Sequence, residues 1–422
     1  MNKLIEIGKK HNIDIEIFKE KHNSTDISTL NDKIKLFQIT NVSKYIIKAI
    51  RDNRCVKIVT ESIKNSEELI NTLEDIFKTS DNKNSNRLCT GNIKNKLRKK
   101  EIIDYSKVKE DLLSLNDLKK KYSCIKSIEA DYTHTERGNY ITNLTNNCDM
   151  EDETYFNAYG VAITVNKDDI TRVLYIGYYT KKYDFSEFKE YLLKKLEYLL
   201  IKLDSKSVTT NKYKVLLTNN VVESILFTFK DSFQSKNIFL NESVLSGKLN
   251  SKIFSDKINI VEDSPKGILN ANFDSEGTLK AKQALVENGV FKKEINNIEY
   301  AIKLNKEATG NANGVNNLYI ECGNKSYEEL IKELDNGIII DEAFGFHSGV
   351  DLKTGNISVQ AEGLLVENGK VTKGLNMIIL SKIFLGKMLR LSGISYILTI
   401  LIMEMQKGKL LKRLGIRLML NM

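Results

Sequence analysis

Residues 273–370 contain the segments FDSEGT (273–278), LVENGV (285–290), TGNA (309–312), NLYIE (317–321), GFHSGV (345–350) and EGLLVENGK (362–370). Asn-Gly between apolar residues is the strongest short signal for a β-hairpin, because a type I′ turn needs a positive φ at both central residues. Asn288-Gly289 and Asn368-Gly369 share a Val-Glu lead-in, and Thr354-Gly355-Asn356 predicts a third turn. The stretch is therefore predicted to be a run of β-hairpins.

One helix is predicted inside this β-rich stretch, over residues 326–335. Ser326 can cap its N-terminus, and Glu329 can reach back to complete a capping box. Asn336-Gly337 is predicted to end it, because glycine tolerates the left-handed conformation that follows a helix. The C-terminal part is thus predicted to be mainly antiparallel β-sheet with a few helices.

These segments, in this order, resemble the hallmark motifs of the TldD/PmbA family, and most of all those of its PmbA (TldE) branch. The resemblance extends over about Lys266 to Met377 and is topologically consistent back to the N-terminus. It implies a two-domain α+β protein whose C-terminal β-structure forms the dimer and encloses a cavity. It also implies a cytosolic peptidase that trims unfolded peptides, in which the metal-bearing TldD branch and the PmbA branch act together.

The first half of the chain repeats a pattern of strands followed by a helix. After a helix at 4–11, strands are predicted at 13–19, 33–40, 43–51 and 54–60, with a helix at 66–78. After a helix at 108–122, strands follow at 127–135, 140–143, 154–165 and 171–179, with a helix at 185–203 that Asp184 can cap. We predict an α+β fold with an N-terminal domain over 1–205 built from two such units. A β-rich domain follows over 206–380, and an atypical tail over 381–422.

Composition narrows the class of protein. The chain has 422 residues, 41% of them hydrophobic, which is enough for two cores. Its net charge of +9 is spread among acidic residues, so neither nucleic acid nor a membrane is an expected partner. The five cysteines lack a Cys-x-x-Cys pair, which indicates reduced thiols. With no signal-peptide run and no stretch of about 18 apolar residues, a cytoplasmic location is expected.

The tail departs from the family pattern after Met377. It holds an apolar segment, Leu391 to Met403, and ends in a basic, Leu-rich stretch. The apolar segment is too short to span a bilayer, and an amphipathic membrane or partner helix is one interpretation. We favour a shifted reading frame that replaces the native C-terminal strands, and resequencing of the coding DNA tests this.

The resemblance raises the question of a metal site. The TldD branch carries a His-Glu-x-x-x-His helix, in which the histidines grip one zinc ion and the glutamate activates its water. By order of elements, the counterpart helix here is predicted over 220–232. It contains Glu223 but no His and no Cys. We therefore expect no metal and no cofactor in this chain, and zinc in the partner subunit.

Four residues are the candidates for substrate contact: Asp274, Glu276, Asn311 and His347. His347 is also the candidate catalytic residue, because a loop histidine between two glycines can act as an acid or base, and the PmbA branch carries it. A turn histidine that satisfies the backbone is the alternative. For Asp274 and Glu276, loop carboxylates that cap backbone N–H groups are favoured over general-acid or metal chemistry. His11, His22 and His134 are predicted to be solvated or half-buried.

The preferred functional hypothesis is a PmbA/TldE-like subunit of a cytosolic metallopeptidase complex. Its expected partners are a TldD-like metal-bearing subunit or a second copy, and an extended peptide held by strand addition. A basic module for nucleic acid or a membrane surface is one alternative. A stand-alone hydrolase that uses His347 with Asp274 or Glu276 is another.

Overall fold

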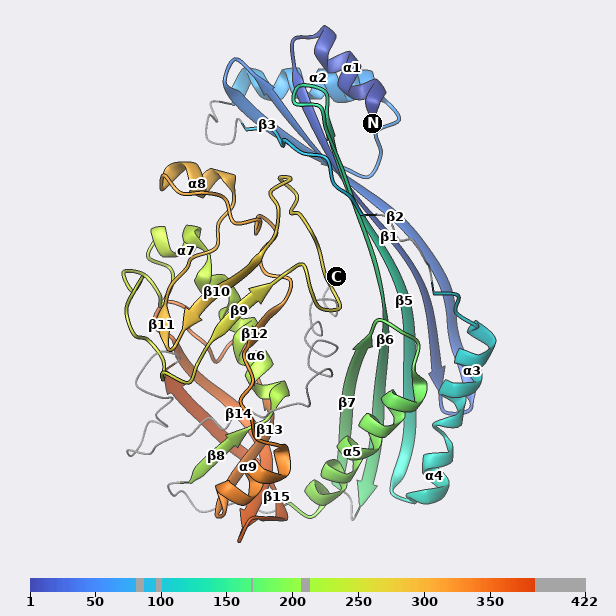
Figure 1. Ribbon diagram of the computed structural model, residues 1–422. Coiled ribbons are helices and arrows are strands. Elements are labelled where there is room, and N and C mark those ends of the chain that lie inside the picture. The colour runs from blue at the N-terminus through green and yellow to red at the C-terminus, as the bar shows by residue number, and fades with distance from the viewer. Residues whose placement is uncertain (81–86, 96–100, 168–169, 206–212, 384–422) are drawn as a thin grey trace.

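The computed structural model describes residues 1–80, 87–95, 101–167, 170–205 and 213–383. Long, curved N-terminal strands run along one side of the molecule, and the C-terminal sheets stand beside them (Figure 1). The predicted boundary near residue 205 falls at 206–212, outside the described residues, as does the tail from residue 384 onward. Among the described residues, no helix is both long and apolar enough to cross a membrane.

The N-terminal strands are much longer than predicted. The strands are β1 (Asp14–Leu30), β2 (Lys33–Arg51), β3 (Arg54–Thr60), β4 (Lys94–Asn95), β5 (Ile125–Asn143), β6 (Cys148–Lys167) and β7 (Ile170–Thr180). Within the described ranges they form one seven-stranded sheet in the order β3-β2-β1-β5-β6-β4, with β7 on β6. The strands predicted at 33–40 and 43–51 are one strand, and those predicted at 127–135 and 140–143 are one strand. Pairing on both sides of β1 holds residues 20–30 extended although they lack an apolar alternation.

Helices cover one face of this sheet. They are α1 (Asn2–Lys10), α2 (Ser66–Thr79), α3 (Tyr105–Ser114), α4 (Asp117–Lys121) and α5 (Phe185–Leu203). The single helix predicted at 108–122 is two helices in the structure, α3 and α4, because the helix is interrupted at Leu115 and Asn116. The α5 prediction is confirmed, and Asp184 caps it by accepting the N–H of Glu187.

The side chains of β1 point alternately to the two faces of the sheet, and their contacts show what covers each face. Ile17 packs with α1 and α2, whereas Phe18 packs with Phe273 of the C-terminal part. Ile27, ten residues after Ile17, packs with α3, α4 and α5. Since successive side chains of a strand point to opposite faces, all five helices cover one face, and the loop that carries Phe273 meets the other.

The C-terminal part contains two further sheets. Its strands are β8 (Lys214–Leu217), β9 (Ile260–Asp263), β10 (Lys282–Glu287), β11 (Val290–Phe291), β12 (Leu318–Ile320), β13 (Gly337–Phe344), β14 (Asn356–Glu367) and β15 (Lys370–Ile383). Its helices are α6 (Asn219–Phe229), η1 (Lys230–Phe233), α7 (Ser235–Phe239), α8 (Ile298–Lys303) and α9 (Tyr327–Leu334). As far as the structure describes the chain, the sheet orders are β11-β10-β9-β12 and β15-β14-β13-β8. Every pairing in them is antiparallel except that of β13 with β8. The predicted α+β fold class is confirmed.

The turns predicted from Asn-Gly are confirmed. Asn288 and Gly289 have φ values of 47° and 75°, and Asn368 and Gly369 have 53° and 68°. The capping box at Ser326 and Glu329 is also present. The helix end is different, because the positive φ of 57° lies at Asp335 and not at Gly337. Gly337 instead begins β13, where a Cβ atom would lie 2.5 Å from the carbonyl oxygen of Lys214.

Candidate functional site

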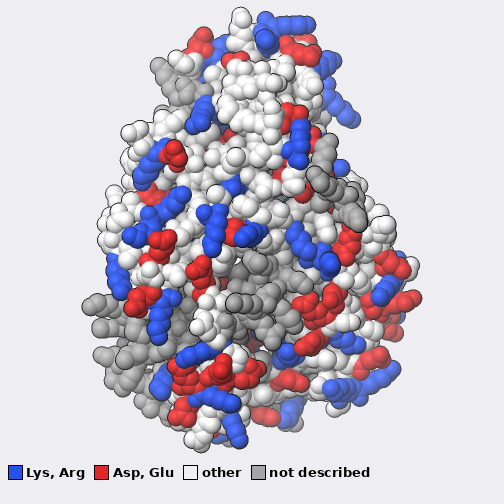
Figure 2. Space-filling model, in the orientation of Figure 1, with Lys and Arg blue, Asp and Glu red and all other residues white. Residues whose placement is uncertain are grey.

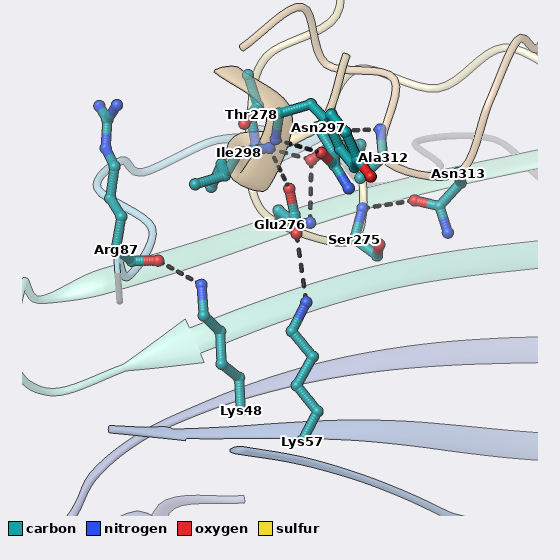
Figure 3. Close-up of polar contacts among 12 residues, drawn as sticks. Lys48, Lys57, Arg87, Ser275, Glu276, Thr278, Asn297, Ile298, Ala312 and Asn313 are labelled. Carbon is teal, nitrogen blue, oxygen red and sulfur yellow. Dashed lines mark hydrogen bonds and ion pairs between the residues drawn. The ribbon is translucent and has the colours of Figure 1, made fainter. Parts of the chain in front are cut away.

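The motif loop, residues 264–280 between β9 and β10, contacts the N-terminal sheet through Glu276 (Figure 3), and Asp274 lies within the same loop. Asp274 is 2% exposed. Its Oδ1 accepts the N–H groups of Glu276 at 2.9 Å and Thr278 at 3.0 Å, and its Oδ2 accepts that of Ala312 at 2.9 Å. Burial raises the pKa of Asp274, and these N–H groups act in the opposite direction. The carboxylate therefore shapes the loop, as the favoured interpretation of the sequence holds.

Glu276 joins the loop to two other elements. Its Oε2 accepts the N–H of Ile298, the first residue of α8, at 2.8 Å. Its Oε1 lies 3.3 Å from Nζ of Lys57 on β3. Only 7% of the Glu276 side chain is exposed, so this ion pair is partly shielded from water. The glutamate thus connects the motif loop to β3, an edge strand of the N-terminal sheet.

A cavity of about 190 Å³ lies beside this ion pair. Four of its lining residues are charged, Glu16, Lys48, Lys57 and Glu276. Oε2 of Glu16 accepts the N–H of Cys89 at 2.6 Å, and burial raises the pKa of Glu16. Lys48 donates to the carbonyl of Arg87. Each of these charged groups already bonds to protein, and Phe18, Ile46 and Val59 complete the lining, so the cavity has a mixed lining where the two parts of the chain meet.

Asn311, the third candidate, is also a loop-shaping residue. It is 5% exposed, accepts from Nε2 of Gln283 at 2.9 Å and donates to the carbonyl of Gly314 at 3.2 Å. The neighbouring Ala312 donates to Asp274. The structure therefore brings Asp274, Glu276 and the turn at 311–314 together.

His347 is not brought into this group. It is exposed in the loop between β13 and β14, in a different sheet from β9 and β10. The hydrogen bonds of Asp274 and Glu276 go to backbone N–H groups and to Lys57. The arrangement gives no support to an acid–base pair of His347 with either carboxylate. Its contact with substrate stays a prediction.

The prediction that His134 is solvated is wrong. It is 7% exposed, and its Nδ1 lies 2.8 Å from Oδ1 of Asn157, which also accepts the hydroxyl of Tyr132. Strands β5 and β6 bury this pair of residues at the centre of the sheet. His22 is half-buried in β1, and burial lowers its pKa, whereas His11 is exposed beside Glu74.

Helix α6 (219–229) lies where the sequence places the expected counterpart of the family's zinc helix. Its residues 219–229 include Glu223 but neither His nor Cys. Glu223 lies close enough to Tyr179 of β7 to add to the rise in the tyrosine's pKa that burial causes. Within the described ranges, no group of three His, Cys, Asp or Glu side chains is arranged to hold a metal ion.

Two contacts between the halves of the chain were missed by sequence reasoning. The first joins Lys181, just after β7, to the motif loop. Its Nζ donates to Thr154 Oγ1 at 2.7 Å, the Tyr155 carbonyl at 2.9 Å and Asn270 Oδ1 at 2.7 Å. Burial lowers the pKa of Lys181 to about 8.

The second contact centres on Lys202 of α5, whose side chain is 1% exposed. Its Nζ lies 3.1 Å from Asp341, 2.9 Å from Glu342 and 3.6 Å from Glu362. Arg172 of β7 binds Glu362 at 2.8 Å. The one sequence signal for the burial of Lys202 was the amphipathic periodicity of α5, which places residue 202 on the buried face of the helix.

Lys181 predicts a pH dependence of stability. Its folded pKa of about 8 lies below the ordinary 10.5, so the unfolded chain binds more protons between these pH values. Stability should therefore rise with pH between 8 and 10.5, by up to about 3 kcal/mol from this group. Below pH 8 the lysine is protonated in both states, so this group should add no further pH dependence there. Urea unfolding of the native protein and of Lys181→Met at several pH values measures this pH dependence of stability. The variant should lack this slope, and equal slopes would contradict the assignment.

Comparisons with known proteins agree with this architecture. Residues 210–400 match the PmbA/TldA metallopeptidase C-terminal domain. A metalloprotease PmbA homologue from Buchnera aphidicola is 30% identical over 183 residues, which is 43% of this chain and 40% of that protein. The chain covers only about two fifths of the length of this relative and of a second Buchnera homologue.

Solved structures extend the likeness to the whole fold. A protein described as a modulator of DNA gyrase from Thermotoga maritima superimposes with a TM-score of 0.81 at 23% identity, covering 91% of each chain. TldE from Thermococcus kodakarensis gives a TM-score of 0.75 at 20% identity, covering 90% of each chain.

The chain thus has an α+β fold, and its residues 210–400 match the PmbA/TldA metallopeptidase C-terminal domain. The family it resembles is TldD/PmbA, as its sequence motifs predict, and that resemblance is confirmed.

Proposed function

We propose that this chain is a PmbA/TldE-like subunit of a peptidase that acts on unfolded peptides, with the catalytic zinc ion in a TldD-like partner. The observation that carries the proposal is the combination of an intact motif loop and an α6 helix without His or Cys. The loop carries motifs by which the chain resembles the family, whereas α6 lacks the ligands that zinc requires. Relatives of the C-terminal part are named metalloproteases.

The free edge of β7 is the proposed track for the peptide. Within the described residues, β7 pairs with β6 along one edge and has no ladder partner on the other. Leu174, Ile176 and Tyr178 are buried, whereas Tyr175 is 76% exposed. An extended peptide can add to such an edge through main-chain hydrogen bonds, which are indifferent to its side chains. Glu223 of α6 is near enough to Tyr179 of β7 to raise its pKa, so the proposed track leads towards α6.

A module for nucleic acid or a membrane surface is less well supported. Figure 2 shows Lys and Arg side chains interspersed with Asp and Glu over the face in view. Many described lysines are paired, among them Lys94 with Asp149 and Glu151. Mixed charge of this kind does not build the positive potential that polyanions require.

The proposal predicts that the purified chain holds negligible zinc and does not cleave an unfolded peptide. Addition of a homologue that carries His-Glu-x-x-x-His should produce cleavage, because the partner supplies the zinc-bound water. Elemental analysis and mass spectrometry of the peptide products measure both. A partner whose motif glutamate is replaced by glutamine is the matched control and should restore no cleavage.

Two results would contradict this function. Stoichiometric zinc with cleavage by the chain alone would make it a complete peptidase. Equal cleavage by the partner with and without this chain would make the chain dispensable. Binding of DNA or anionic vesicles that collapses steeply with added salt would instead favour the basic module.

A further inference from the structure

Three sulfur atoms meet where the motif loop touches the N-terminal sheet. Sγ of Cys148, the first residue of β6, lies 2.9 Å from Sγ of Cys89. Sδ of Met150 lies 3.4 Å from Sγ of Cys89. We call these residues the sulfur cluster. Cys89 is 5% exposed and the other two are 1% exposed, so the cluster is shielded from solvent.

The backbone around Cys89 is held firmly in this position. Its N–H donates to Glu16, and its carbonyl accepts from Nδ2 of Asn143 at 3.0 Å and of Asn146 at 3.2 Å. Glu16 also accepts from Asn143 at 3.0 Å. These bonds fix Cys89 on the strand ends that carry Cys148. The close approach of the two thiols is therefore built into the fold.

We propose that Cys89 and Cys148 are a thiol pair that closes reversibly into a disulfide in the presence of hydrogen peroxide or glutathione disulfide. With peroxide, both S–H bonds break, one S–S bond forms, and the peroxide is reduced to two water molecules. With glutathione disulfide, two exchange steps release two molecules of glutathione. A disulfide is about 2.05 Å long, so the sulfur atoms need to approach by only about 0.9 Å.

The pair contacts the motif loop. Sγ of Cys89 lies 3.7 Å from the carbonyl oxygen of Gly277, between Glu276 and Thr278. A bond to Cys148 would link residues 59 positions apart in sequence and fix Cys89 to β6. Oxidation would thereby stiffen the surface on which the motif loop rests. This inference does not depend on the proposed peptidase role.

The chemistry predicts slow closure. The hydrogen bond with Cys148 and then burial raise the pKa of the Cys89 thiol, so little of the reactive thiolate is present. The less buried Cys124 and Cys322 should react with oxidant or alkylating reagent first. Blocking them before oxidation therefore leaves the buried pair free to close.

The experiment uses the full chain, reduced and then incubated with glutathione disulfide at pH 8.5. Remaining thiols are alkylated in denaturant, and non-reducing peptide maps are read by mass spectrometry. We expect one linked peptide that joins Cys89 to Cys148, lighter by about 2 Da than the two reduced peptides together. Dithiothreitol should reverse the link.

Two variants make the result specific. In Cys148→Ser, Cys89 should be found alkylated or joined to glutathione. In Cys55→Ser, which removes an equally buried thiol outside the sulfur cluster, the link should form as in the native chain. Because the native chain alone decides the pairing, a variant that fails to fold does not leave the question open. Alkylation of both Cys89 and Cys148 after prolonged oxidation, or a link to another cysteine, overturns the proposal.

Coupling to the motif loop is measured by hydrogen exchange of the oxidised and reduced forms. We expect slower exchange after oxidation at residues 87–95 and 274–278, and unchanged exchange in α9, which is far from the cluster in sequence. Equal exchange of 274–278 in the two forms would overturn the coupling while leaving the disulfide itself intact.

Discussion

Replacement of Lys202 by methionine is expected to destabilise the fold by about 3–5 kcal/mol, because it leaves buried carboxylates without their counter-charge. Lys202 lies on α5 in the N-terminal half, and Asp341, Glu342 and Glu362 lie on β13 and β14 in the C-terminal half. Burial alone would lower the pKa of Lys202, but the three carboxylates outweigh it and the pKa is raised. Burial raises the pKa of Asp341.

Urea unfolding followed by circular dichroism measures this loss. Lys194→Met is the matched control on the same helix, since Lys194 pairs with Glu190 at 3.0 Å and its side chain is 69% exposed. The control should lose less than about 0.5 kcal/mol. The triple variant Lys202→Met with Asp341→Asn and Glu342→Gln should recover part of the loss. A Lys202→Met variant as stable as Lys194→Met would show that this cluster does not hold the two halves together.

Local signals in the sequence predicted the two Asn-Gly turns and the N-terminal helix caps at Ser326 and Asp184 correctly. Asn288-Gly289, Asn368-Gly369 and the Ser326–Glu329 box lie where expected, because their conformations depend on two to four adjacent residues. Helix α5 was predicted with its observed bounds, since its apolar stripe and its cap are strong and continuous. Such features need no knowledge of the tertiary structure.

Features that depend on distant partners were predicted poorly. Residues 20–30 of β1 have no apolar alternation, and they are extended because β2 and β5 pair with them on both sides. His134 is buried because β5 pairs with β6, and Asn157, 23 residues away on β6, bonds to its ring. Lys202 is balanced by carboxylates about 140 residues further along the chain. A single sequence does not reveal which residues such groups will meet.

The sequence identified the residues of the candidate site but did not predict which of them lie together in the structure. Asp274, Glu276 and Asn311 were identified from the motifs and lie together, bonded largely to backbone groups. His347 was identified from the same kind of motif but lies in the loop between β13 and β14, strands of another sheet than β9 and β10. Motifs shared within a family mark positions important to its fold as well as to its chemistry, and spacing alone does not separate the two.

Replacement of Gly277 by alanine is expected to destabilise the protein by about 2–5 kcal/mol, through steric overlap and backbone strain together. The φ of Gly277 is +74°, and a Cβ atom there would lie 2.2 Å from Sγ of Cys89. The next nearest atom, Cβ of Cys89, would lie at 2.6 Å. Since hydrogen bonds fix the backbone of Cys89, the motif loop must move away from the N-terminal sheet. The Lys57–Glu276 ion pair would then be lost with it.

Gly345→Ala separates the two causes. Gly345 also has a positive φ, +83°, but a Cβ atom there meets nothing within 4 Å, so it should lose only the strain of about 1–2 kcal/mol. The difference between the two variants in urea unfolding measures how tightly the motif loop packs on the sheet. Hydrogen exchange at residues 274–278 should be faster in Gly277→Ala and native-like in Gly345→Ala. Equal losses in both variants would mean that the motif loop shifts without further cost. Contact with Cys89 would then not determine the position of the loop.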